Sequence, residues 1–250
     1  MDDKISMWLG QYLRQWPLFD ETILMISSSH LVKGAALCSI LVYIWSHVPK
    51  GALDNGRAKQ FDNRLTIIAA LISSVFAEAL ALVLSKTLEF RLRPFLEPEL
   101  QMDVPDRLLD FAASMSTGSS FPSDHAVLFA AMVTGIFMVS RSLGLFAALY
   151  SIVFIAFPRV YLGLHYTSDI VVGALIGVIC AVAGVTLLRQ VSLMRLPVQL
   201  TYSHQALIAP LSFLFVFQVA TMLEDIRALA KVPSHAAASQ EPQPRFVFHG

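Results

Sequence analysis

The stretch that decides the fold is FPSDHAVLFAAMVTGIF, Phe121 to Phe137. Within it, a proline, a serine, a carboxylate and an imidazole run directly into a segment that is almost entirely apolar. Ionisable groups at membrane depth are costly unless they are paired or bind something. The stretch therefore predicts a membrane helix whose first turn carries polar groups for a reason other than packing.

The composition extends this interpretation to the whole chain. Of its 250 residues, 56% are hydrophobic and only 14% are charged, whereas a soluble domain has about 25% charged residues. A soluble protein with a buried helical core is the alternative, but too few polar residues remain to coat such a core. The net charge is zero, so we expect no nucleic-acid partner.

Six apolar segments reach or approach the roughly 20 residues that a helix needs to cross a bilayer. They are Leu31–Ser46, Leu65–Leu84, His125–Ser140, Leu145–Val160, Ile170–Leu188 and Ala206–Leu223. Only the residues SRSLG separate the third segment from the fourth, which predicts a tight helical hairpin with Arg141 at its tip. The expected fold class is all-α, an integral membrane bundle of about six transmembrane helices.

The two ends of the chain differ from this bundle. Residues 1–30 alternate apolar and polar groups and include Trp8 and Trp16, so they predict an amphipathic helix in the membrane interface. Residues 231–250 contain Pro and Ser without periodicity and predict a disordered tail. The expected domains are therefore the interfacial segment 1–30, a six-helix membrane domain over 31–230, and the tail.

With six spans, eight polar residues fall on one side of the membrane. They are Lys86, Arg93, Ser123, Asp124, His125, Arg159, His165 and Asp169. The short loops on the opposite side carry Lys50, Arg57, Lys59, Arg64, Arg141, Arg189 and Arg195. Because basic loops favour the cytoplasmic side, we expect the eight polar residues, and with them both termini, to face outward.

The eight residues form three groups with chemistry in common. Lys86, Arg93 and Arg159 together attract an anion, and the planar fork of arginine matches phosphate oxygens. If Pro122 occupies the first helical position, the N–H groups of Ser123, Asp124 and His125 lack intrahelical partners and form a phosphate cradle. His125 lies at the rim of that cradle, where it can donate a proton to a leaving oxygen.

His165 and Asp169 supply the remaining chemistry. A neutral imidazole nitrogen is a competent nucleophile toward phosphorus when the other ring nitrogen is held as a donor, and a carboxylate can hold it. We expect Thr167 or Ser168 to cap the fifth span, which places Asp169 in its first turn. Spacing alone does not say whether this carboxylate reaches the ring.

The three groups resemble the signature of the type 2 phosphatidic acid phosphatase superfamily, which includes vanadium haloperoxidases and bacterial acid phosphatases. That signature is Lys, six residues, Arg-Pro; then Pro-Ser-Gly-His; then Ser-Arg, five residues, His, three residues, Asp. Every internal spacing is kept between Lys86 and Asp169. The resemblance implies that His165 forms a phosphohistidine, that Asp169 orients it and that His125 is the general acid. It implies phosphate binding, without metal or cofactor, by Lys86, Arg93, Arg159 and the backbone at Ser123 and Asp124.

The chain departs from that signature at two positions. Asp124 stands where glycine is usual, and Pro158 stands where serine precedes the arginine. Asp124 brings negative charge close to an anionic substrate, so we expect it to pair with a nearby arginine or to accept a proton from a diphosphate. Pro-Ser-Asp-His is similar to the form in undecaprenyl-diphosphate phosphatases of the bacitracin-resistance type.

The other charged residues nearby are given no catalytic role. Arg91 is interpreted as a surface residue, although it could touch a second phosphate. The acidic segment before the second group is interpreted as a solvated loop; a lid hinged at Ser116–Ser120 and a divalent-ion site are the alternatives. Its acidic residues are Glu97, Glu99, Asp103, Asp106 and Asp110.

Together these features predict a metal-independent membrane hydrolase that removes phosphate from a lipid (di)phosphate. The expected substrate is undecaprenyl diphosphate, and the expected place is a bacterial plasma membrane with the site on its outer, periplasmic side. Phosphatases or phosphotransferases acting on phosphatidate, phosphatidylglycerophosphate or lipid A stay open within the superfamily. A non-catalytic anionic-lipid binder or permease is the alternative of another class, and it is disfavoured because the charges cluster at one boundary.

Overall fold

The computed structural model describes residues 2–48, 53–104, 107 and 118–203, and this part of the chain is helical, without a strand. The α-helices are α1 (Asp2–Gly10), α2 (Pro17–Ser28), α3 (His30–Ser46), α4 (Leu53–Thr87), α6 (Asp124–Val139), α7 (Arg141–Ser151), α8 (Phe157–Tyr161), α9 (Thr167–Leu188) and α10 (Arg195–Ser203). Shorter elements are the 3₁₀ turns η1 (Pro94–Leu96) and η3 (Ser192–Met194), and the π-helical segment η2 (Ile152–Ala156).

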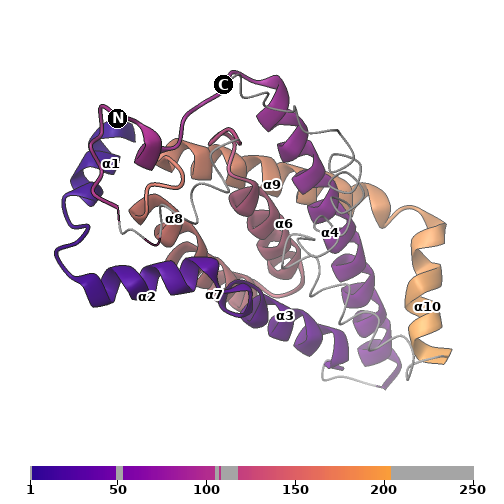
Figure 1. Cartoon of the computed structure of the whole chain (residues 1–250). Helices are drawn as coiled ribbons and strands as arrows, with labels where there is room; N and C mark the ends of the chain where they lie inside the picture. Colours follow the sequence, from indigo (N-terminus) through magenta and orange to yellow (C-terminus); the bar gives the residue numbers. More distant parts are fainter. Residues whose placement is uncertain (1, 49–52, 105–106, 108–117, 204–250) are drawn as a thin grey trace, which may run out of the picture.

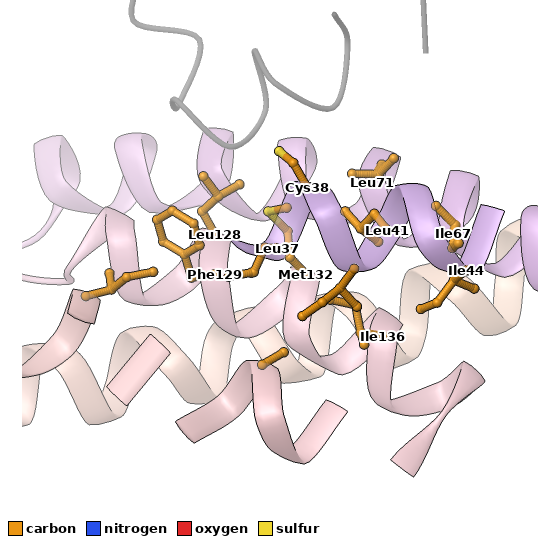
Figure 2. Close-up of a cluster of buried hydrophobic side chains, with 13 residues drawn as sticks. Leu37, Cys38, Leu41, Ile44, Ile67, Leu71, Leu128, Phe129, Met132 and Ile136 are labelled. Carbon is orange, nitrogen blue, oxygen red and sulfur yellow. The ribbon is translucent and has the colours of Figure 1, made fainter. Parts of the chain in front are cut away.

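Helix α6, the body of the opening stretch, lies in the middle of the bundle against α4, α7 and α9 (Figure 1). Its apolar residues are buried on several sides, as a central helix requires. Figure 2 shows part of this core, where Leu128, Phe129, Met132 and Ile136 of α6 lie with Leu37 and Leu41 of α3 and Ile67 and Leu71 of α4. The core therefore fixes the position of α6, and with it the polar first turn.

Glycines let α9 approach α6 closely. A Cβ atom on Gly173 would lie 2.7 Å from the carbonyl oxygen of Ser123, and one on Gly177 would contact the carbonyl oxygen of Val127. Between membrane helices, where lipid is as apolar as the side chains, such close packing is a principal source of association. The N-terminal ends of α6 and α9 are thereby held against each other at one end of the bundle.

Three helical stretches of the described residues are long and apolar enough to cross a membrane: Asn55–Thr87, Arg141–Tyr161 and Thr167–Leu188. Helices α2 and α3, bent by 51° at their junction, make a candidate fourth span. Helix α6 has 16 residues, or about 24 Å at 1.5 Å per residue, which is less than a hydrocarbon core of about 30 Å. The first five predicted segments thus fall on helices, while Ala206–Leu223 and the tail 231–250 lie outside the described residues.

Two details of the prediction change, and a third is confirmed. The single helix expected over residues 1–30 is two helices, α1 and α2, separated by residues 11–16. Helix α4 extends well beyond Leu65 toward its N-terminus; hydropathy did not predict the added turns because they carry charged residues and bury only one face. The expected hairpin is present, since α6 ends at Val139 and the Ser140 hydroxyl accepts from the N–H of Leu143 to start α7.

The run from α7 to α8 contains the wide π-helical turn η2, in which the N–H of Phe157 donates to the carbonyl of Ile152. Two residues after the end of the turn comes Pro158, which has no N–H to donate to the helix before it. Single π turns within helices are frequent at functional sites. Here Arg159, one of the predicted site residues, lies three residues after the end of the turn, in α8.

Candidate active site

Three segments distant in the sequence meet where α6 and α9 begin: residues 88–93, residues 118–123, and residues 162–166 with the first turn of α9 that follows them. The N–H of Ser123 donates to the carbonyl of Asp169 at 3.3 Å, and the N–H of Ser120 donates to the carbonyl of Arg91 at 2.9 Å. Gly163 has a φ of +68°, in the left-handed region that favours glycine. The turn at Gly163 reverses the direction of the chain after α8 and so places His165 against the other segments.

His165 is buried, and its surroundings fix its tautomer. The ring Nδ1 lies 2.8 Å from the backbone carbonyl of Ser120. Because a carbonyl oxygen only accepts, Nδ1 carries the hydrogen and Nε2 carries a lone pair. Arg93 Nη1 lies 3.4 Å from this Nε2 and donates to the carbonyl of Leu164 at 2.9 Å. The lone pair suited to nucleophilic attack therefore lies beside a guanidinium group.

Asp169 is fully buried in the first turn of α9. Its Oδ2 lies 3.8 Å from His165 Nδ1, which is too long for a hydrogen bond. The same oxygen accepts from the N–H of Tyr166 at 2.9 Å and from the hydroxyl of Ser120. Ser120 therefore links the two groups, since its carbonyl holds the imidazole and its hydroxyl binds the carboxylate.

Two sequence expectations about this turn need correction. The residue that caps α9 is Tyr166, not Thr167 or Ser168, because Asp169 reaches back to the Tyr166 N–H. Ser120 was not recognised, because it is one of several serines in the STGSS run and no spacing distinguishes it. The only signal for Ser120 would have been the carboxylate of Asp169, because a carboxylate known to be buried needs a hydroxyl or charged partner.

Arg91 was interpreted as a surface residue, and this is wrong. Its Nη1 lies 2.6 Å from Asp169 Oδ1 and 2.9 Å from the Ser168 hydroxyl. Its guanidinium lies 3.8 Å from the centre of the Tyr166 ring. A buried carboxylate is stable only with a cation or several donors nearby, and Arg91 supplies the cation. A second arginine two residues before Arg93 was the available signal.

The start of α6 also differs from the expectation. The helix begins at Asp124, and the Ser123 hydroxyl caps it by accepting from the N–H of Ala126, so Pro122 lies outside the helix. Two of the three N–H groups expected to form a phosphate cradle have partners: that of Ser123 donates to the Asp169 carbonyl and that of His125 to the Asp124 carboxylate at 2.8 Å. A carboxylate at this position satisfies the donors that a glycine would leave open.

Asp124 pairs with His125. The ring Nδ1 of His125 lies 3.0 Å from Asp124 Oδ1, so it donates to the carboxylate, and this contact stabilises the protonated imidazole. Asp124 was expected to pair with an arginine, but Arg93 is only a neighbour whose charge interacts with it. Burial lowers the pKa of Arg93 from its ordinary value, and the charges of Asp124 and Asp169 act in the opposite direction. His125 Nε2 is buried and has no hydrogen-bond partner among the described residues.

A pocket of about 210 Å³ opens beside His125, between α6, the run from α7 to α8, and α9. Its polar end is formed by His125 and Arg159, and Arg159 Nη2 donates to the carbonyl of Ser27 at 3.1 Å. Its walls are apolar, and small side chains leave most of the space: Ala126, Ala130, Ala148, Ala156 and Ala174. The pocket continues the polar site into the apolar interior of the bundle.

The comparisons with known proteins bear on the family of the chain. A family model described as the PAP2 superfamily matches residues 63–192, just over half of the chain. The chain belongs to the PAP2 superfamily. The range matched by the PAP2 model begins within α4, ends beyond α9 and includes all eight predicted site residues. The resemblance stated from the sequence is therefore confirmed.

A curated relative adds detail to the PAP2 assignment. The bacitracin transport permease protein BcrC from Bacillus licheniformis is 30% identical over 119 residues, which cover 48% of this chain and 54% of that protein. The chain thus spans about half the length of the curated relative that it matches. No solved structure matches the chain.

Seven of the eight predicted residues converge at this end of the PAP2 region, and Lys86 is the exception. Lys86 is exposed at the end of α4 and makes no hydrogen bond or ion pair with any described residue. The part of the chain that the structure describes contains no group of three or more His, Cys, Asp or Glu side chains that could hold a metal ion. Among the described residues, Arg93 lies beside His165 and Arg159 beside His125, while Arg91 contacts Asp169.

Proposed function

We propose that this protein is a membrane lipid phosphatase that hydrolyses a lipid (di)phosphate through a phosphohistidine formed on His165. The observation that carries the proposal is the direct junction of two unlike environments at His125. On one side lie the imidazoles and arginines, and on the other lies the apolar pocket that His125 and Arg159 close off. A lipid phosphate has the same two parts, a charged headgroup and an apolar chain.

In the first step, the lone pair on His165 Nε2 attacks the phosphorus atom. The bond from phosphorus to the leaving oxygen breaks, its electron pair passes to that oxygen, and His125 donates the Nε2 proton to it. Arg93 and Arg159 offset the charge on the equatorial oxygens of the transition state. The Ser120 carbonyl stabilises the charge that develops on His165, because it already accepts the Nδ1 hydrogen.

In the second step, water replaces the lipid. Neutral His125 takes a proton from the water as its oxygen attacks phosphorus, the bond from phosphorus to His165 breaks, and the electron pair returns to Nε2. Inorganic phosphate leaves, and His125 is again protonated. Asp124 supports His125 in both steps, because its carboxylate stabilises the imidazolium form.

Undecaprenyl diphosphate is the proposed substrate, supported by Pro-Ser-Asp-His and by the similarity to a protein named for bacitracin. Phosphatidate, phosphatidylglycerophosphate and lipid A remain candidates, with hydrolysis or phosphotransfer as the reaction. The relative is named a transport permease. In this chain, the buried charged residues Lys33 and Glu78 favour a transport role. We further propose six spans, a bacterial plasma membrane and an outward-facing site, from the distribution of basic loops.

The test is phosphate release by the purified protein in detergent. The panel is undecaprenyl diphosphate, phosphatidate, phosphatidylglycerophosphate and a short water-soluble phosphate ester, with undecaprenyl diphosphate expected to have the highest kcat/KM.

Ala148→Phe fills the pocket and should lower kcat/KM for the lipids by about tenfold or more while sparing the soluble ester. Val153→Phe, an exposed position of the neighbouring turn, is the control. Release from none of the substrates would refute the phosphatase function.

A further inference from the structure

The N-terminal helix reaches the site through a single carboxylate. Asp2, at the start of α1, accepts from the N–H of Ser168 at 3.3 Å and from the Ser168 hydroxyl at 2.5 Å. Ser168 lies in the first turn of α9, where a negative charge is favoured by the helix dipole. Helix α1 packs against α8 and α9, as expected from this contact (Figure 1).

Arg91 joins this carboxylate to the one beside His165. Its Nη2 donates to Asp2 Oδ2 at 3.1 Å, while its Nη1 donates to Asp169 Oδ1 at 2.6 Å. The two ends of one planar fork thus hold two different carboxylates, and the Tyr166 ring lies against its face. Only an arginine has the geometry for both contacts, because a lysine is a single point charge.

We infer that Arg91 is a positioning residue for Asp169, and that Asp2 holds Arg91 in place from helix α1. The inference rests on the proposed function, since it takes the Asp169–Ser120–His165 connection to serve catalysis. Arg91 places a positive charge 2.6 Å from Oδ1 of the fully buried Asp169, and this contact holds the carboxylate so that its Oδ2 accepts from the Ser120 hydroxyl. Ser120 in turn keeps its carbonyl on His165 Nδ1. Without the Asp2 carboxylate, Arg91 loses one of its two carboxylate contacts and is free to move away from Asp169.

The experiment compares four variants with the full-length wild-type protein in detergent: Arg91→Ala, Arg91→Lys, Asp2→Asn and the double variant Arg91→Ala/Asp2→Asn. The matched control is Arg189→Ala, which removes an arginine paired with Asp62 at 3.0 Å. Arg189 follows the last turn of α9, about 31 Å of helix away from Ser168 at 1.5 Å per residue. Steady-state phosphate release from the best wild-type lipid substrate gives kcat and KM separately.

Residues that orient metal ligands typically contribute about ten- to a hundredfold, and we take the same range for a residue that orients Asp169. Arg91→Ala should therefore lower kcat by about that factor while KM stays within about twofold, and Arg91→Lys should recover part of the loss. Asp2→Asn should lower kcat less, and the double variant should be no worse than Arg91→Ala, because Asp2 acts only through Arg91. Arg189→Ala should match the wild type.

Three results would overturn the inference: a wild-type kcat in Arg91→Ala, a rise in KM with kcat unchanged, or additive losses in the double variant. A second readout needs no activity and separates this inference from the proposed function. Amide hydrogen exchange at Ser168 should accelerate in Asp2→Asn and in Arg91→Ala but not in Arg189→Ala. Unchanged exchange in both variants would refute the link from α1 even in a protein with no phosphatase activity.

Discussion

Ser120→Ala isolates one contact of the site from its neighbours. The substitution removes the hydroxyl that donates to Asp169 Oδ2 and leaves the Ser120 carbonyl on His165 Nδ1, because that carbonyl belongs to the backbone. Asp169 retains the Tyr166 N–H and Arg91 as partners. The variant therefore asks what the link between the carboxylate and the imidazole contributes when the tautomer of the imidazole is unchanged.

The expected magnitude follows from the kind of bond. A hydrogen bond to a charged group contributes about 1.5–3 kcal/mol, and each 1.36 kcal/mol of transition-state stabilisation is tenfold in rate. If the full free energy of this hydrogen bond stabilises the transition state, removing the bond lowers kcat by about 10- to 150-fold. The same loss of a buried donor also lowers the free energy of unfolding, so the thermal midpoint should fall as well.

The assay is steady-state phosphate release in detergent, with the thermal midpoint measured on the same preparations. Ser74→Ala is the matched control, because Ser74 is equally buried but its hydroxyl donates to the Leu71 carbonyl within its own helix. Ser74→Ala should keep the wild-type kcat. Equal kcat in the two serine variants would refute the link through Ser120, and a Ser120→Ala protein as inactive as His165→Ala would show that the hydroxyl does more than orient Asp169.

Three further predictions concern charge. Asp124→Gly should lower kcat about tenfold, since His125 loses the carboxylate on its Nδ1, and should change the ratio of activities on diphosphate and monophosphate lipids; an unchanged ratio contradicts the role of Asp124. Chelator should leave phosphate release unaffected, whereas vanadate, a mimic of trigonal-bipyramidal phosphorus, should inhibit it competitively. Burial raises the pKa of Asp2, but hydrogen bonds from Ser168 and Arg91 outweigh it and leave the pKa below the ordinary 3.8. The contribution of Asp2 to the docking of α1 is therefore fully present above that pH and is lost as the pH falls through the lowered pKa. Trp8 fluorescence should report this change in the wild type and not in Asp2→Asn.

The parts of the fold that the sequence predicts are those with long apolar runs. Helices α3, α6 and α9 coincide with predicted segments, because hydropathy measures the same property that places a helix in a bilayer. The extension of α4 before Leu65 and the division of the N-terminal segment into α1 and α2 were not predicted. Both depend on packing against distant parts of the chain, which hydropathy does not record.

The site residues likewise divide into those that the sequence predicts and those that it does not. Spacing within the three groups predicts that residues such as Arg93, His125 and His165 meet, because helix ends on one side of a bundle lie close together. Spacing does not predict contacts made by residues outside the groups, such as Ser120, Arg91 and Asp2. These contacts arise from the requirement that a fully buried carboxylate be given donors and a cation, and that requirement becomes visible only when Asp169 is seen to be buried.

The central claim is that His165 carries the phosphoryl group during turnover. The most direct test is rapid quenching of the purified protein with a lipid diphosphate labelled at its terminal phosphate, followed by mass spectrometry of the peptides under alkaline conditions that preserve a phosphorus–nitrogen bond. We expect label on His165 in the wild type, and in His165→Ala neither label nor turnover at normal expression. Label on any other residue, or more than a few per cent of wild-type turnover in His165→Ala, would contradict it.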